Sequence, residues 1–114
     1  MKKSVKRKVE KLVKGDPLKQ DHLVVMLQQT TTEYVALEEE KERYYRQNIG
    51  KADRVVIHSL YLRQIYLDSL IRKIYKMVDA LISLEIDFDN EVATQIYNHY
   101  NPQIKRGLTT LEKL

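Results

Sequence analysis

The chain has 114 residues, of which 43% are hydrophobic and 32% charged, with a formal net charge of +4. This length favours a single domain, and this composition excludes an intrinsically disordered chain. The lack of cysteine excludes disulfides and thiolate metal sites, and no stretch approaches the ~20 apolar residues of a membrane-spanning helix.

The first 14 residues carry the basic character of the chain. They hold seven Lys or Arg against one acid, Glu10, which is +6, whereas the remaining residues sum to −2. Apolar residues recur at helical spacing, which predicts a basic amphipathic helix over 1–14: Val5, Val9, Leu12 and Val13. Gly15-Asp16-Pro17 is typical of one helix ending and the next beginning, so 15–114 is predicted to be the main helical domain. No apolar signal core follows the basic residues, and we expect a cytoplasmic protein.

A second helix is predicted from Pro17 to about Gln47. Its inward positions follow an a/d-like spacing that Lys41 interrupts: Leu23, Leu27, Thr30, Tyr34, Leu37 and Tyr44. The β-branched run of residues 30–32 is its weak point, where a kink or break would fall. The charged run of residues 38–43 is interpreted as a solvated face.

A third helix, from about Ala52–Asp53 to about Leu84, is predicted to be the central element. Ile57, Tyr61 and Ile65 widen its apolar face, so we expect neighbours on more than one side. The main face is marked by Val56, Leu60, Leu67, Ile71, Ile74, Val78 and Leu81.

Two further helices are predicted near the C-terminus. The capping residues of the segment 87–90 precede a fourth helix with inward Val92, Ile96 and Tyr100. Asn101-Pro102 repeats the cap-then-proline pattern and predicts a last short helix that carries Ile104, Leu108 and Leu111. The predicted fold class is therefore all-α, a bundle of four to five helices around one long central helix.

No pattern in the sequence indicates catalysis or a metal or cofactor site. His22, His58 and His99 are far apart and lack the spacing that puts two ligands on one helical face. Asp87 and Asp89 begin no calcium loop, because its glycine and its distal glutamate are absent. We expect no enzyme, no metal and no cofactor.

Tyrosine is the distinctive residue, with eight Tyr against one Phe and no Trp. Tyrosine suits both core edges and interfaces, because it combines apolar area with a polar tip. The predicted partner interface lies on the third helix, at Tyr61, Leu62, Tyr66 and Tyr75. It would serve other protein subunits or further copies of the same chain.

Nucleic acid is an alternative partner for the basic segment. Seven side chains could contact phosphates without reading sequence: Lys2, Lys3, Lys6, Arg7, Lys8, Lys11 and Lys14. A solvated end helix explains them equally well. We expect no membrane binding, because four apolar residues, mostly valine, make a thin anchor.

The segment SLYLRQIYLDSLIRKIYKM, residues 59–77, resembles the long central helix of GINS subunits, which join the replicative helicase to its partners. The matching positions are Tyr61, Leu62, Arg63, Arg72, Lys73 and Ile74. The resemblance covers about residues 24–100 and implies an adaptor or scaffold subunit of a DNA replication complex. The small β-domain that GINS subunits normally add has no strand-like counterpart here. The alternative hypothesis is a stand-alone nucleic-acid-binding protein of viral or plasmid type.

Overall fold

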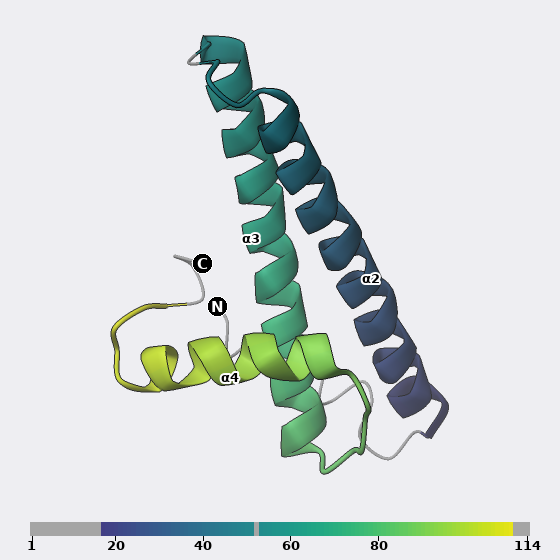
Figure 1. The fold of residues 1–114 in the computed structure, drawn as a ribbon. Coiled ribbons are helices and arrows are strands. Elements are labelled where there is room, and N and C mark those ends of the chain that lie inside the picture. Colours follow the sequence, from purple (N-terminus) through teal and green to yellow (C-terminus); the bar gives the residue numbers. More distant parts are fainter. Residues whose placement is uncertain (1–16, 52, 111–114) are drawn as a thin grey trace.

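The computed structural model describes residues 17–51 and 53–110, which form three helices (Figure 1). They are α2 (Pro17–Gln47), α3 (Arg54–Ser83) and α4 (Glu91–Lys105). Helices α2 and α3 run antiparallel as a long hairpin, and the shorter α4 crosses α3 near its C-terminal end (Figure 1). The predicted basic helix over 1–14 lies outside the described residues.

The all-α class is confirmed, but four to five helices is wrong for the part of the chain described. Helix α4 continues through Pro102 to Lys105, where a separate last helix was predicted. Proline removes only the hydrogen bond to the carbonyl of Asn98, and Asn98 is exposed, so water can satisfy that carbonyl. After Arg106 the chain turns at Gly107, whose φ of +73° suits glycine.

Helices α3 and α4 both begin at a capping side chain, and the cap of α4 comes from the predicted segment 87–90. Asp53 accepts a hydrogen bond of 2.7 Å from the backbone N–H of Val55, and Asn90 accepts one of 3.0 Å from Ala93. The side-chain amide of Asn90 also donates to the hydroxyl of Thr31 at 3.0 Å. This bond ties the start of α4 to the middle of α2.

Helix α2 passes through its three threonines without a break. Their hydroxyls donate to the carbonyls four residues earlier, at 2.8 Å for Thr30, 2.7 Å for Thr31 and 2.9 Å for Thr32. The hydroxyls are thus satisfied within the helix rather than by an alternative turn, and the helix continues to Gln47.

The core lies in the lower half of Figure 1, where α4 packs against the hairpin. Six of the seven residues predicted for the main face of the central helix are buried, and Leu60 is half-buried. The residues closed off from solvent most completely are Leu27, Leu70, Ile74, Val78 and Leu81. Ile57, Tyr61 and Ile65 are instead exposed, because α4 does not extend to that end of α3.

The buried face of α3 can be tested with two isoleucines on the same helix. Replacing Ile74, which has no exposed area, with alanine should lower the free energy of unfolding by about 2–5 kcal/mol. The same change at Ile82, which is 49% exposed, should change it by less than about 0.5 kcal/mol. Urea denaturation measures both, and equal losses would contradict this packing.

Candidate interaction surface

The upper half of the hairpin is the stalk, which comprises residues 34–47 of α2 and 54–67 of α3. Helix α4 reaches the stalk only at its lower end, where Tyr34 packs against the core, and leaves the rest uncovered (Figure 1). Of the stalk residues, only Val56 and Leu67 are buried. The stalk is therefore a pair of helices whose outer surfaces face solvent.

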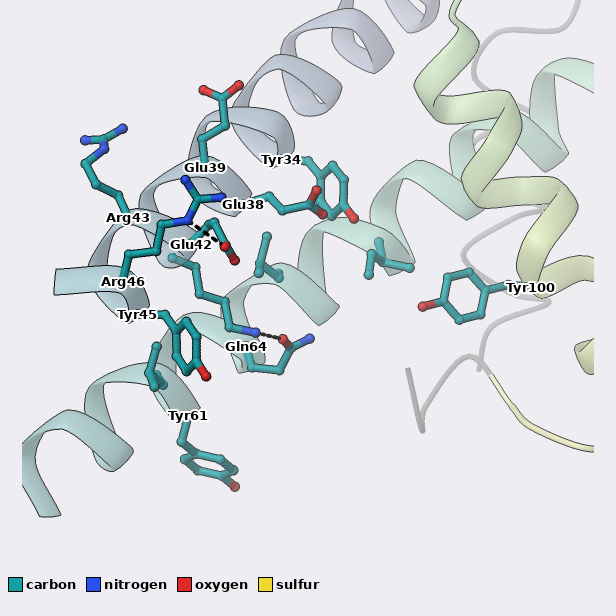
Figure 2. A pocket seen from close by; sticks show the side chains of 14 residues that line it. Tyr34, Glu38, Glu39, Glu42, Arg43, Tyr45, Arg46, Tyr61, Gln64 and Tyr100 are labelled. Carbon is teal, nitrogen blue, oxygen red and sulfur yellow. Dashed lines mark hydrogen bonds and ion pairs between the residues drawn. The ribbon is translucent and has the colours of Figure 1, made fainter. Parts of the chain in front are cut away.

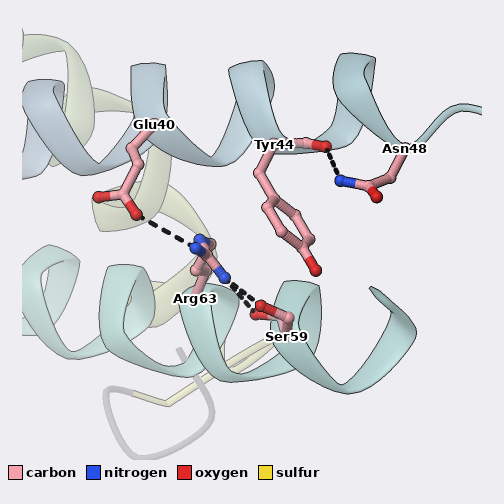
Figure 3. A network of polar contacts seen from close by, with 5 residues as sticks. All are labelled: Glu40, Tyr44, Asn48, Ser59 and Arg63. Atoms are coloured by element: carbon pink, nitrogen blue, oxygen red, sulfur yellow. Dashed lines mark hydrogen bonds and ion pairs between the residues drawn. The ribbon is translucent and has the colours of Figure 1, made fainter. Parts of the chain in front are cut away.

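The two helices of the stalk contact each other through a row of polar side chains, the polar seam, where more apolar contacts would be usual. The guanidinium of Arg63 donates to the carboxylate of Glu40 at 3.2 Å and to the hydroxyl of Ser59 (Figure 3). The guanidinium carbon also lies 4.3 Å from the ring centre of Tyr44, a cation–π contact. Beside it, the ammonium of Lys41 donates to the side-chain oxygen of Gln64. Lys41, which interrupts the apolar spacing of α2, thus has a partner on α3.

A groove of about 1250 Å³ runs along one side of the stalk and ends at α4. Its apolar lining comes from α3, at Leu60, Leu67 and Ile71. Four tyrosines from three helices surround the opening, as Figure 2 shows: Tyr34, Tyr45, Tyr61 and Tyr100. The groove thus combines apolar and aromatic side chains with charged and amide side chains.

The rim of the groove carries charges of both signs in a definite order along α2. Glu38 and Glu39 come first, Lys41 and Glu42 follow, and Arg43 and Arg46 come last, one to two turns after the acidic pair. Arg46 forms an exposed ion pair of 3.0 Å with Glu42. Such an exposed pair contributes little stability and can exchange partners.

Two tyrosines of the groove, Tyr34 and Tyr100, have a raised pKa. Burial, followed by the hydrogen bond to Glu38 and its charge, raises the pKa of Tyr34 far above its usual range. Burial, and then the charge of Asp68, raises the pKa of Tyr100. These phenols stay protonated and present apolar rings with neutral hydroxyl groups.

Exposed apolar side chains concentrate on the stalk and its tip. Among the described residues, twelve large hydrophobic side chains are exposed, and eight of them lie between positions 45 and 66. Ile57, Tyr61 and Ile65 are spaced by four residues and so share one face of α3. They are 60%, 61% and 44% exposed, and they extend the apolar surface beside the groove.

The residues predicted for the partner interface divide into two groups. Tyr61, Leu62 and Tyr66 are exposed on the stalk, where the interface role stays a prediction. Tyr75 is instead 5% exposed and belongs to the core, because α4 covers it. Its ring stacks on Tyr97 at 5.0 Å, and its hydroxyl donates to Asn101 at 2.7 Å.

The tyrosine walls of the groove were not predicted from the sequence. Tyr34 and Tyr45 are eleven residues apart, which is close to three helical turns and puts both on one face of α2. That spacing is the signal that could have revealed them. Tyr100 was predicted to point inward and is half-buried at the end of the groove.

The basic side chains and the histidines are the two remaining groups of residues singled out in the sequence. The seven basic side chains of residues 2–14 lie outside the described residues. All three histidines are exposed, and residues 17–51 and 53–110 contain no group of three His, Asp or Glu placed to hold a metal ion. In the same ranges, no helix is long and apolar enough to cross a membrane.

Comparison with known proteins found no matching family model, no matching curated protein and no matching solved structure. The resemblance to GINS subunits therefore stays a prediction from the sequence. Tyr61 and Leu62 of that pattern are exposed on the stalk, whereas Ile74 lies in the core.

The placement of Tyr75 predicts a pH dependence. Burial, and then the charges of Asp79 and Tyr97, raise the pKa of Tyr75 from 10.0 to about 12. The unfolded chain then loses this proton first as the pH rises, so the contribution of Tyr75 to stability is complete below pH 10 and falls toward pH 12. At neutral pH, Tyr75→Phe should lower the free energy of unfolding by about 1 kcal/mol, because the bond to Asn101 is lost.

The difference between the parent and Tyr75→Phe should narrow as the pH rises through this range. Urea denaturation at neutral pH and at several alkaline pH values measures it. A difference that stays constant or grows would contradict the buried, protonated state of Tyr75.

Proposed function

We propose that the chain is a non-catalytic interaction module, an adaptor or scaffold subunit, that binds another protein through the stalk. The observation that carries this proposal is the gathering of exposed apolar side chains on the half of the hairpin that α4 leaves uncovered. Isolated exposed apolar residues are ordinary, but Ile57, Tyr61 and Ile65 share one face of α3 beside the groove, and exposed apolar side chains grouped in this way are typical of interfaces.

The charged rim supports a protein partner over a small molecule. The groove is open to solvent along the stalk, and charges of both signs border it (Figure 2). Small-molecule sites are usually more enclosed, with only a few polar groups. Apolar centres with charged edges are common in protein interfaces.

A place in a DNA replication complex is the more specific form of this proposal. It draws on the GINS-like residues of α3, and Tyr61 and Leu62 among them are exposed on the stalk. A cytoplasmic location fits a chain without cysteine.

The stalk is tested by affinity capture with a matched pair of variants. Tyr61→Glu puts a charge in the middle of the apolar patch, whereas Val25→Glu puts one on α2 outside the stalk. Both positions are exposed, at 61% and 45%, so both variants should melt close to the parent. Proteins captured with the tagged parent should be retained by Val25→Glu and lost, by at least about tenfold, with Tyr61→Glu.

Quantitative mass spectrometry of the captured proteins is the measurement. Enrichment of helicase-associated proteins would support the replication complex in particular. The same set of proteins on the parent and on Tyr61→Glu would overturn the stalk as the binding surface.

Nucleic acid remains the second candidate partner because residues 1–14 sum to +6 while the rest of the chain sums to −2. Any attraction to phosphates should therefore come from this segment. Binding would be non-specific and strongly weakened by salt, because phosphate contacts release counterions.

The nucleic-acid alternative is tested by changing charge alone. Replacing Lys3, Lys6, Arg7 and Lys11 with Gln keeps helix propensity while removing four positive charges. If all four contact phosphates, the slope of log K against log salt should fall by about 3 to 4 for duplex DNA. Fluorescence anisotropy at several salt concentrations measures this slope. Unchanged binding would place the DNA contact elsewhere, and a parent that never binds DNA would exclude this alternative.

A further inference from the structure

The groove is open to solvent along the stalk and has a volume of about 1250 Å³. Helix α4 crosses α3 below it (Figure 1), and Tyr100 of α4 lines its lower end. The groove thus lies directly above α4, on the part of the hairpin that α4 leaves open.

The order of charges along α2 is self-complementary in one orientation only. The charged residues that line the groove begin with the acidic pair Glu38 and Glu39 and end with Arg43 and Arg46. Lys41 and Glu42 lie between these pairs and cancel each other in charge, and Glu42 also forms an exposed ion pair with Arg46. A second copy laid antiparallel would bring the acidic pair of each copy opposite the basic pair of the other. A parallel copy would bring like charges together, which is unfavourable. A two-fold axis perpendicular to the helix produces the antiparallel arrangement.

The apolar surface lies at the centre of this charge pattern. The contacts of Lys41 with Gln64 and of Glu40 with Arg63 place the middle of the charged run level with Tyr61 and Ile65. A two-fold axis at this level would bring the two Tyr61 rings close together. Tyr45 and Tyr61 line the groove, and Ile57 and Ile65 share the face of α3 with Tyr61, so these four exposed residues provide apolar area toward the ~800 Å² that each partner covers in a stable interface.

The two ends of the groove also complement each other. Tyr100 of α4 closes the lower end, and the hairpin turn with Ile49, 65% exposed, forms the upper end. In an antiparallel pair the turn of each copy would reach α4 of the other. Each copy would then cover exposed apolar area on its partner.

We propose that a second copy of this chain occupies the groove, with the two stalks packed antiparallel about a two-fold axis near Tyr61. The proposal rests on the stalk being a protein-binding surface, and it names the partner. The dimer is the form in which the chain would act as a scaffold, with two α4 helices at opposite ends.

Charge reversal on the rim tests the arrangement. A variant with Glu38→Lys and Glu39→Lys has a fully basic set of four rim residues, and a variant with Arg43→Glu and Arg46→Glu has a fully acidic set. Each should dimerise at least about tenfold more weakly than the parent, because like charges then face each other across the interface. Mixed in equal amounts, the two should form a heterodimer.

The variant with all four reversals restores opposite charges and should again form a homodimer. Sedimentation equilibrium over a range of concentrations measures the dissociation constants. Circular dichroism melting confirms that the variants remain folded, since Glu39, Arg43 and the other two rim positions are exposed.

A cross-link tests the register. The chain has no cysteine, so Tyr61→Cys introduces a single thiol. A short bis-maleimide should join two copies through this position and should not join two copies of a Val25→Cys control. Cross-linking of both variants to the same extent would overturn the proposed axis.

Two outcomes would overturn the dimer itself. One is a parent that stays monomeric at high concentration, and the other is a mixture of the two charge variants that forms no heterodimer. Either result leaves the affinity capture to decide the proposed function, because a different protein could then occupy the stalk. Only loss of both the dimer and the Tyr61-dependent capture removes the stalk as a binding surface.

Discussion

A helix of 15 residues cannot cover helices of 30 and 31 residues, and the rest of the structure depends on this mismatch of lengths. At 1.5 Å per residue, α4 spans roughly 22 Å against roughly 45 Å for the hairpin. Three helices therefore enclose a core only where α4 lies, around Ile74, Val78 and Leu81. Beyond it, the hairpin must be held by contacts between two helices, which bury little on their outer sides. The stalk, its groove and its exposed apolar face all follow from this difference.

The polar seam of the stalk determines the register of α2 on α3 more than it adds stability. The Glu40–Arg63 pair is partly solvated, and such pairs contribute about 0–1 kcal/mol. Sliding one helix along the other would separate Arg63 from both Glu40 and Tyr44 and would leave Lys41 without Gln64. The Nε of Arg63 is already buried without a hydrogen-bond partner. Because each further unbonded nitrogen would add to this cost, the register in which the other nitrogens of Arg63 are bonded is favoured. Apolar contacts alone would more readily allow α2 and α3 to pack in several registers than these directional polar contacts do.

The sequence predicted the helices well where local signals decide them. Helix α2 has the predicted bounds, and Asp53 and Asn90 cap the helices that they were expected to begin. Prediction from the sequence failed where contacts between residues far apart in the chain determine which side chains are buried. The apolar spacing of Ile57 and Ile65 is the same whether or not a neighbour covers them, so periodicity could not show that α4 stops short. The burial of Tyr75 depends on the crossing of α4, which places Tyr97 and Asn101 against it. The pattern at Pro102 predicted the start of a new helix, because a sequence does not show that the carbonyl that the proline leaves unbonded faces water.

The bond between Asn90 and Thr31 marks the level at which the molecule divides into two cooperative units. Below it, opening any helix exposes the shared core, so those amides should exchange with solvent only on global unfolding. Above it, the ends of α2 and α3 can separate while the core stays intact, so exchange should become faster toward Gly50. A protein that binds the upper unit would suppress this local opening and leave the slow exchange below almost unchanged. Under the proposed function, recognition and folding stability would depend on different parts of one short chain, and selection could alter the first with little effect on the second.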